Sequence, residues 1–345
     1  MNVRPWLIPL NPLYRLGVSL RDLRLRYGWE PIRHLRYPVI SIGNLSTGGA
    51  GKTPLTIALA RELAARMGVD VLSRGFGRYT KAVARVRPEG TAEEFGDEPL
   101  LIARDAGVPV YVANQRYEAG LLAEAQFRST ASQPVVHILD DGFQHRQLHR
   151  DIDILILNRA DWNDRLLPAG NLREPLHAAH RANILAIPAD EPDLEAELRA
   201  FGWQGPLWRL RRHMNVPPIV GPVAAFCGIA RPDQFFSGLQ AAGLHVATRT
   251  AFPDHHHYVQ HDVDCVLGAA RTVKAAAIFT TEKDRVRLAH LAVAFPESMP
   301  LKTAGLRIEV DNAVAYLDPL LHQIESLQNR HPADQSSTRT VFHRP

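Results

Sequence analysis

The sequence predicts an α/β protein in which a doubly wound parallel sheet is followed by a second, smaller α/β domain. From residue 37 onward, apolar runs without polar alternation are separated by segments of helical composition. This pattern is typical of parallel strands that helices cover on both faces. The chain has 345 residues, of which 46% are hydrophobic and 22% charged, so it is long enough for two domains with separate cores.

The predicted elements follow one another in a regular order. Buried strands are expected at residues 37–44, 69–75, 108–114, 134–142, 151–158 and 182–189, with helices at 53–68, 96–107 and 120–129. Proline and glycine at 217–222 indicate a linker, after which strands and helices continue through 223–243, 244–258, 275–284 and 301–310. We expect a main domain over 37–212, a smaller domain over 213–325 and a polar, disordered tail over 326–345.

Residues 1–36 form a basic segment ahead of the first strand. Its seven arginines are accompanied by only Asp22 and Glu30. Apolar residues recur at helical spacing, with a tryptophan at either end: Trp6, Leu13, Leu16, Leu20, Leu23, Tyr27 and Trp29. The pattern fits a basic amphipathic helix that lies in a membrane interface. A helix packed on the main domain would explain the same pattern.

The composition disfavours several other classes of protein. The formal charge is +4 and the excess arginine is scattered, which does not favour nucleic acid as a partner. No apolar stretch approaches the roughly 20 residues that span a bilayer, so we expect a cytoplasmic protein that can still touch a membrane surface. Cys227 and Cys265 lie in apolar contexts without metal-type spacing, and we expect both to be buried free thiols.

A glycine-rich stretch lies between the first predicted strand and the first predicted helix. It follows the phosphate-loop (P-loop) pattern G-x-x-x-x-G-K-[ST], with serine at the first position: Ser46, Thr47, Gly48, Gly49, Ala50, Gly51, Lys52 and Thr53. In this pattern backbone N–H groups surround phosphate oxygens, the lysine reaches the β- and γ-phosphates and the hydroxyl binds Mg²⁺. We therefore expect the main domain to be a P-loop domain that binds a nucleoside triphosphate, ATP or GTP.

A pair of aspartates ends the strand predicted at 134–142. Asp140 and Asp141 follow the apolar run "VVHIL", which places their carboxylates at the carboxyl end of the sheet beside the phosphate loop. Carboxylate oxygens are typical ligands of Mg²⁺. We expect Thr53 and at least one member of this pair to hold the metal.

Two further polar clusters bear on the reaction. Asp97 follows a glycine at a predicted helix start, and a kinase that acts on an alcohol needs a carboxylate or an imidazole to take the hydroxyl proton. Asp97 is therefore a candidate base. The loop at 254–261 contains four histidines: His255, His256, His257 and His261. Pro253 and the absence of an H-E-x-x-H motif favour one histidine directed at the cleft over a zinc site.

The motifs resemble those of the tetraacyldisaccharide 4'-kinases, the lipid A 4'-kinases of Gram-negative bacteria. The resemblance covers residues 38–310 and is carried, in order, by "GNLSTGGAGKTP", "SRGFGR", "FGDEP", "ILDDGFQHRQLHRDIDILILN", "LLPAGNLREP", "FCGIARPDQFF", "FPDHHHY" and "TTEKDRVRL". It implies transfer of the ATP γ-phosphate to the 4'-hydroxyl of a tetraacylated glucosamine disaccharide 1-phosphate, which gives lipid IVA. It also implies ATP in a cleft between the two domains.

The resemblance implies roles for individual residues. Asp97 is similar to the family's catalytic base, and His255 resembles its partner; Lys52 keeps its phosphate role. Three residues are expected near the substrate or its phosphate: Arg116, Gln144 and His145. A tetraacylated substrate stays in a bilayer, so residues 1–36 are expected to attach the enzyme to an anionic membrane surface, the cytoplasmic face of the inner membrane. No nucleic acid and no protein partner are expected.

Two other classes share the phosphate loop. A metal-trafficking or regulatory GTPase would use the histidines for metal, but the guanine motif N-K-x-D is matched only at Lys283 and Asp284, within "TEKD". A partitioning or scaffold ATPase would hydrolyse ATP slowly and dimerise with nucleotide. Neither class accounts for "FGDEP" or "DDGFQHRQL".

Overall fold

The computed structural model describes residues 4–127, 134–291 and 295–330. In this part of the chain the strands form one sheet of 12 strands, in the order β10-β9-β11-β12-β8-β7-β6-β1-β5-β2-β4-β3. The pairs β3·β4 and β8·β12 are antiparallel and the other pairs are parallel. A predominantly parallel sheet confirms the predicted α/β class.

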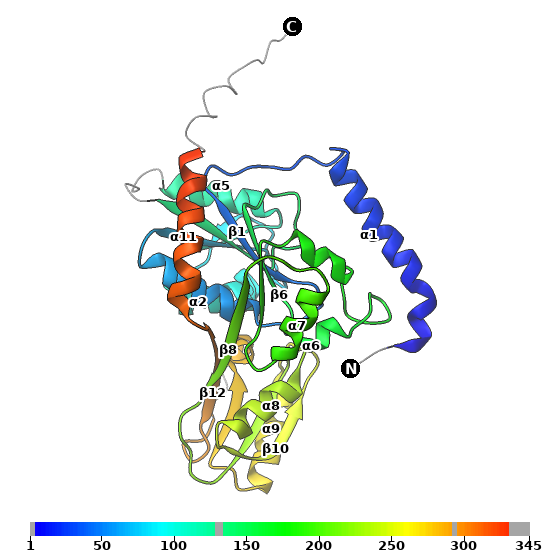
Figure 1. Cartoon of the computed structure of the whole chain (residues 1–345). Helices are drawn as coiled ribbons and strands as arrows, with labels where there is room; N and C mark the ends of the chain where they lie inside the picture. Colours follow the sequence, from blue (N-terminus) through cyan, green and yellow to red (C-terminus); the bar gives the residue numbers. More distant parts are fainter. Residues whose placement is uncertain (1–3, 128–133, 292–294, 331–345) are drawn as a thin grey trace.

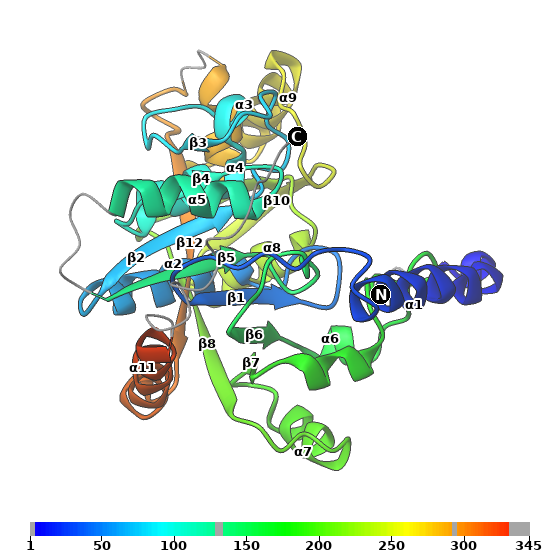
Figure 2. The same cartoon turned by 90° about the horizontal axis from the view of Figure 1, so that it is seen from above.

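The N-terminal part, residues 37–215, contributes eight strands of the sheet. They are β1 (Val39–Asn44), β2 (Gly68–Ser73), β3 (Ala84–Arg85), β4 (Val110–Val112), β5 (Val135–Asp140), β6 (Ile152–Ile156), β7 (Ile184–Pro188) and β8 (Leu207–Asn215). Its helices are α2 (Lys52–Ala64), α3 (Ala92–Phe95), α4 (Asp97–Asp105), α5 (Arg116–Phe127), α6 (Arg159–Trp162), η2 (Leu176–Arg181) and α7 (Pro192–Ala200). They are preceded by η1 (Pro5–Leu10) and α1 (Asn11–Arg26), which stands to one side of the sheet in both views (Figures 1 and 2).

The C-terminal part, residues 222–310, repeats the alternation on a smaller scale. Its elements are β9 (Pro222–Cys227), α8 (Pro232–Ala241), β10 (His245–Ala251), α9 (Gln260–Thr272), β11 (Ala277–Thr281), α10 (Glu282–Arg287), η3 (Leu288–His290) and β12 (Leu301–Val310). A last helix, α11 (Ala313–Arg330), follows β12.

Helices cover both faces of the sheet, as the unbroken apolar strands predict. In the N-terminal part, one face packs on α2, α4 and α11 through a shared core that includes Ile42, Leu59 and Leu320. The opposite face packs on α5 and α7 in two smaller cores. In the C-terminal part, α8 and α9 lie on opposite faces, since Phe236 and Val266 belong to different cores.

The sequence-based boundaries differ from the structure in two places. The predicted boundary at residues 212 and 213 falls inside β8, of which residues 210–215 pair with β12. The sequence prediction divides residues 313–330 between the smaller domain and the tail. In the structure they form α11, whose apolar residues pack in the core of the N-terminal part (Figure 1). Residues 326–330 are helical, and residues 331–345 lie outside the described part of the chain. The division into two domains stays a prediction.

The cysteines also differ from expectation. Cys227 is buried in the core beneath α8, as predicted, whereas Cys265 is exposed on α9. An apolar run on an amphipathic helix contains positions on both faces, and Cys265 falls on the outer one. Neither cysteine is in a disulfide.

Candidate active site

The predicted phosphate loop connects β1 to α2 at the centre of the sheet. Strand β1 lies between β6 and β5, so the loop opens at the carboxyl end of parallel strands, where nucleotides bind in such sheets. Gly48 and Gly49 have φ values of 77° and 59°, which favour glycine. The C-terminal part also approaches here: a Cβ on Gly48 would lie 2.6 Å from Cβ of Ala230, and one on Gly49 would lie 2.8 Å from Arg231. Larger residues would therefore push the two parts apart.

Lys52 begins α2 and faces the end of β1. Its Nζ donates to Oδ1 of Asn44 at 2.9 Å and lies 3.4 Å from Oδ1 of Asp141. Arg173 holds the same two partners, at 2.6 Å from Oδ1 of Asn44 and 2.9 Å from Oδ1 of Asp141. Although burial acts to raise it, the pKa of Asp141 is held well below its usual value by Lys52 and Arg173. Asp141 is therefore an ionised carboxylate already neutralised by two cations.

Asp140, the last residue of β5, has a different environment. It is buried, and its Oδ1 accepts a hydrogen bond from Thr56 of α2 at 3.2 Å. Burial, together with the negative charges of Glu98 and Asp141, raises the pKa of Asp140 to about 7. Thr53 is buried at the start of the same helix. A buried acid crowded by other acids is stabilised by a nearby cation.

Asp97 and His255 meet across the two parts of the molecule. Nδ1 of His255 lies 3.4 Å from Oδ2 of Asp97, which also accepts from Nε of Arg287 at 2.9 Å. The backbone N–H of Glu98 donates to the other oxygen of Asp97 at 3.0 Å. Both oxygens of Asp97 are thus engaged, while Nδ1 of His255 faces the carboxylate and its Nε2 lies on the far edge of the ring.

The charges at this contact set the protonation of both groups. Although burial opposes it, the hydrogen bond from His255 and the positive charge of Arg287 hold the pKa of Asp97 well below its usual value. The hydrogen bond to Asp97 raises the pKa of His255 above its usual 6.5. A proton shared by this pair therefore rests on the imidazole.

A second contact joins α4 to the C-terminal part. Nζ of Lys283, on α10, is ion-paired with Glu98 of α4. Asp284 accepts hydrogen bonds from the backbone of Gly228 at 3.1 Å and from the hydroxyl of Tyr258 at 3.0 Å. The two residues that partly match a guanine motif thus have structural partners within the chain.

The residues expected near the substrate lie beside Asp141. Arg116 is buried at the start of α5, and its Nε has no hydrogen-bond partner among the described residues. Burial lowers the pKa of Arg116 to about 10, so it remains a cation at neutral pH. Burial and the charges of Arg116 and Arg150 lower the pKa of His145 to about 3, so its ring is neutral. Gln144 donates to the backbone oxygen of Asn44 at 2.9 Å.

The structure brings most of the predicted residues to one place. Lys52, Asp140 and Asp141 lie together, and Asp97 is in contact with His255. Sequence reasoning assigned no role to three residues that complete these contacts: Asn44, Arg173 and Arg287. All three stand in motifs quoted for the family resemblance, within "GNLS", "LREP" and "DRVRL", and this is the signal that could have identified them.

The four histidines of residues 254–261 each have a different partner. His256 pairs with Asp262 at 2.9 Å, and Nε2 of His261 lies 3.5 Å from Sγ of Cys265. His257 stacks on His290 with ring centroids 4.6 Å apart. Of the four, His255 is the one that contacts Asp97.

Helix α1 combines contacts to the body with an exposed apolar face. The hydroxyl of Tyr14 donates to the backbone oxygen of Arg173 at 3.0 Å, Asp22 accepts from Arg146 at 2.6 Å, and Leu25 is buried. The exposed fractions of the large apolar side chains on and beside the helix range from 37% to 76%: Trp6, Ile8, Leu10, Leu13, Leu16, Leu20, Leu23, Tyr27 and Trp29. Among the described helices, none is long and apolar enough to cross a bilayer.

Comparison with known proteins gives one consistent result. The family model described as LpxK: Tetraacyldisaccharide-1-P 4'-kinase matches residues 3–324. The tetraacyldisaccharide 4'-kinase of Koribacter versatilis is 39% identical over 332 residues, covering 93% of this chain and 99% of that protein. That of Geobacter sulfurreducens is 39% identical over 336 residues, covering 88% and 91%. The crystal structure of "apo" form LpxK from Aquifex aeolicus in complex with ATP matches with a TM-score of 0.72, 32% identity, and coverage of 93% and 99%.

Proposed function

The chain belongs to the tetraacyldisaccharide-1-P 4'-kinase family, and from this membership we propose that it transfers the γ-phosphate of ATP to the 4'-hydroxyl of a tetraacylated glucosamine disaccharide 1-phosphate. The product is lipid IVA, so the enzyme is a kinase of lipid A biosynthesis. The observation that carries the proposal is the meeting of Asp97 and His255 beside a phosphate loop. The contact supports the proposal because a kinase that acts on an alcohol needs a proton acceptor next to its nucleotide.

ATP is proposed to bind along residues 46–53, with its terminal phosphates at Lys52. Mg²⁺ bound by Thr53 and Asp140 would supply positive charge to the β- and γ-phosphates. The raised pKa of Asp140 supports this assignment, because a dication there offsets the crowding of acids. Asp141, already paired with Lys52 and Arg173, is the less available ligand.

Lys52 and Arg173 are proposed to stabilise the transferring phosphoryl group. Both cations lie at Asp141, and the γ-phosphate offers a stronger anion. When Lys52 turns to the phosphate, Arg173 keeps Asp141 neutralised. This exchange keeps the buried charges paired throughout, and preorganised cations lower the barrier of phosphoryl transfer.

Asp97 and His255 are proposed to accept the proton of the 4'-hydroxyl as one unit, with Asp97 as the base and His255 as its partner. The depressed pKa of Asp97 keeps the carboxylate ionised at neutral pH, in the state that can accept a proton. The raised pKa of His255 means that the proton then rests on the imidazole, beside the carboxylate that stabilises it. Arg287 fixes Asp97 in place.

Arg116, Gln144 and His145 are proposed to bind the substrate, with Arg116 directed at its 1-phosphate. A buried guanidinium whose Nε has no partner is suited to a phosphate oxygen. The neutral ring of His145 can hydrogen-bond a hydroxyl or phosphate without adding repulsion to Arg116. Together these residues give polar recognition next to the phosphoryl donor.

The exposed face of α1 is proposed to dock the enzyme on the anionic, cytoplasmic face of the inner membrane. Its leucines are about half exposed, and burying apolar surface in the interface is favourable. The substrate gives a reason for this location, since extracting four acyl chains into water costs about 0.8 kcal/mol per methylene.

The proposed activity is tested by a transfer assay. The full chain is incubated with γ-³²P-ATP, Mg²⁺ and a tetraacylated disaccharide 1-phosphate in detergent micelles, and labelled lipid is resolved from ATP. Labelled lipid that depends on the acceptor is expected. A matched acceptor without a free 4'-hydroxyl serves as the control. ATP hydrolysis without labelled lipid would contradict the proposal.

A further inference from the structure

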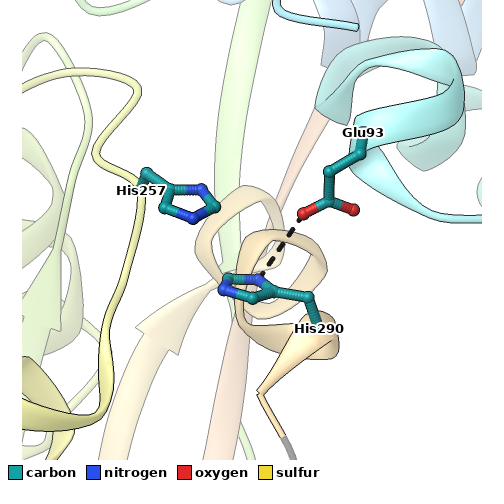
Figure 3. A group of neighbouring side chains, drawn as sticks. All are labelled: Glu93, His257 and His290. Atoms are coloured by element: carbon teal, nitrogen blue, oxygen red, sulfur yellow. Dashed lines mark ion pairs between the residues drawn. The ribbon is translucent and has the colours of Figure 1, made fainter. Parts of the chain in front are cut away.

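Three side chains near the contact between the two parts could bind a metal ion. Glu93, His257 and His290 each offer one ligand atom, and these atoms all lie within 4.8 Å of one another. Figure 3 shows the carboxylate of Glu93 turned toward the ring of His290, with the ring of His257 beside it. The closest ion-pair distance in the group is 3.7 Å, between Nδ1 of His290 and Oε1 of Glu93.

Two backbone carbonyls lie against the ring of His290. Its Nδ1 lies 2.7 Å from the backbone oxygen of Arg287, and its Nε2 lies 3.1 Å from that of Tyr258. A neutral imidazole has one N–H and can donate to only one of these carbonyls. The other ring nitrogen must therefore turn away from its carbonyl before its lone pair can reach a metal ion. Histidine ligands of metals commonly donate their second N–H to a backbone carbonyl in this way.

We propose that Glu93, His257 and His290 form a site for a transition-metal dication of the Zn²⁺ type. Two imidazoles and a carboxylate are a ligand set that Zn²⁺ takes, with water in the fourth position. Tetrahedral bonds of about 2.0–2.1 Å need ligand atoms about 3.4 Å apart, so the side chains must close in on one another. His257 is exposed but its ring stacks on that of His290, with centroids 4.6 Å apart, so metal binding requires the two rings to separate.

The position of the site gives the ion a regulatory role. Glu93 precedes Asp97 by four residues, His257 follows His255 by two, and His290 follows Arg287 by three. The ion therefore ties together the three segments that carry the Asp97–His255–Arg287 contact. Because Glu93 belongs to the N-terminal part and the histidines to the C-terminal part, it acts as a clamp between them. A clamp opposes the opening that releases product, so it lowers kcat.

Binding is tested without reference to activity. The full chain, freed of metal by a chelator and supplied with excess Mg²⁺ to fill the proposed ATP-metal site, is titrated with Co²⁺ while its visible ligand-field absorption is followed; Zn²⁺ then displaces the Co²⁺. One equivalent is expected, and Zn²⁺ is expected to raise Tm by at least about 2 °C. Glu93→Gln and His257→Ala should each weaken binding by at least about tenfold.

Two control variants separate this site from others. His245→Ala changes an exposed histidine on β10 and should leave the Co²⁺ spectrum unchanged. His261→Ala removes the histidine beside Cys265 and should also have no effect. A spectrum lost in His261→Ala, an unchanged affinity in His257→Ala, or no saturable Co²⁺ absorption in the parent chain would overturn the proposal. The last result would mean that the cluster holds only a proton.

The effect on turnover rests on the proposed kinase function. Zn²⁺ at concentrations that fill the site should lower the kcat of the parent chain with saturating Mg²⁺ and ATP, and should lower it much less in Glu93→Gln. Equal inhibition of both proteins would overturn the clamp while leaving the binding result intact. Absence of kinase activity in both, with metal binding preserved, would count against the proposed function alone.

Discussion

The lysine of the phosphate loop shows how a side chain is held ready without nucleotide. Nζ of Lys52 lies between Asn44 and Asp141, both at the end of parallel strands. Its side chain is 11% exposed, so the charge is nearly desolvated and interacts strongly with any phosphate that replaces Asp141.

Replacing Lys52 should separate catalysis from folding. Lys52→Ala is expected to lower kcat by on the order of 100-fold or more, because the transferring phosphate loses a preorganised cation. Arg173 still neutralises Asp141 in this variant, so the thermal unfolding curve should stay close to that of the parent. Steady-state kinetics and calorimetry check both expectations. Near-normal turnover in a folded variant would remove Lys52 from the mechanism.

The Asp97–His255 pair should respond to mutation as a unit. Alanine at either position is expected to lower kcat far more than it raises KM for ATP, and the double variant should be little worse than the worse single one. Fully additive losses in steady-state assays would mean that the two residues act separately. Glu195→Ala, on the distant α7, is a control for the loss of an ion-paired carboxylate.

The pH dependence of kcat follows from the same pair. His255 must be neutral to hold the transferred proton, so activity should fall as pH drops through its pKa, which lies above the usual 6.5. In Asp97→Asn the carboxylate that raises this pKa is gone. The acid limb of the kcat profile should then move to lower pH, on top of the reduced rate. If the acid limb of Asp97→Asn stays at the pH of the parent, a group other than His255 controls it.

Spacing in the sequence was enough for some site residues and not for others. Lys52 and Thr53 follow from an eight-residue motif, and Asp140 from its place after an apolar strand. Arg287 and Arg173 contact residues 190 and 129 positions away. No local pattern encodes such contacts, which arise only when strand order brings distant loops together.

At the level of elements, α1 is held to the body on one side and exposed on the other. Arg21 is ion-paired with Glu174 at 3.4 Å, whereas Arg15 and Arg24 are exposed. The membrane hypothesis therefore concerns Arg15 and Arg24, while Arg21 helps to hold the helix on the body of the protein. The sequence predicted the amphipathic helix but not this division of its arginines.

Reversal of the two exposed arginines should weaken membrane binding. The double variant Arg15→Glu and Arg24→Glu loses roughly 2 kcal/mol or more of attraction to anionic lipid, on the order of 30-fold in vesicle affinity. Its KM for the lipid should rise while its affinity for ATP stays unchanged. Added salt should weaken the binding of the parent chain, because the Debye length falls to about 3 Å at 1 M. Co-sedimentation with vesicles measures both effects.

A charge-matched control changes two cations of the C-terminal part, away from α1. Arg271→Glu and Lys274→Glu change the net charge equally, at exposed positions at the end of α9. This variant should bind vesicles like the parent chain. If the α1 variant sediments with vesicles as well as the parent does, α1 is only a structural helix and does not bind the membrane.

For the whole molecule, one continuous sheet runs through both parts, but each part has its own hydrophobic cores. The antiparallel pair of β8 and β12 joins the N-terminal and C-terminal parts, and α11 then returns to the first of them, as Figure 1 shows. The sequence predicted both series of strands and helices from their local patterns. It did not predict α11, whose residues it divided between the smaller domain and the tail, and a local pattern does not indicate which sheet a helix covers.

The location of α11 predicts where a core mutation is felt. Leu320 is 2% exposed in the core shared with β1 and α2, so Leu320→Ala should destabilise the chain by about 2–5 kcal/mol. Hydrogen exchange should show the loss of protection in the strands β1, β5 and β6. Leu239→Ala, in the core beneath α8, should instead affect β9 and β11. Protection lost only in the C-terminal part of Leu320→Ala would contradict the assignment.

The return of α11 also orders events during synthesis. Domains generally fold from the N-terminus as they leave the ribosome, but here the face of the sheet that α11 covers stays bare until residues 317–324 have been made. The whole C-terminal part is translated in that interval. The nascent chain therefore carries an exposed apolar strip while the C-terminal part is translated, the kind of surface that chaperones bind. Completion of the nucleotide-binding core thus falls among the last events of biogenesis, although its phosphate loop is among the first segments translated.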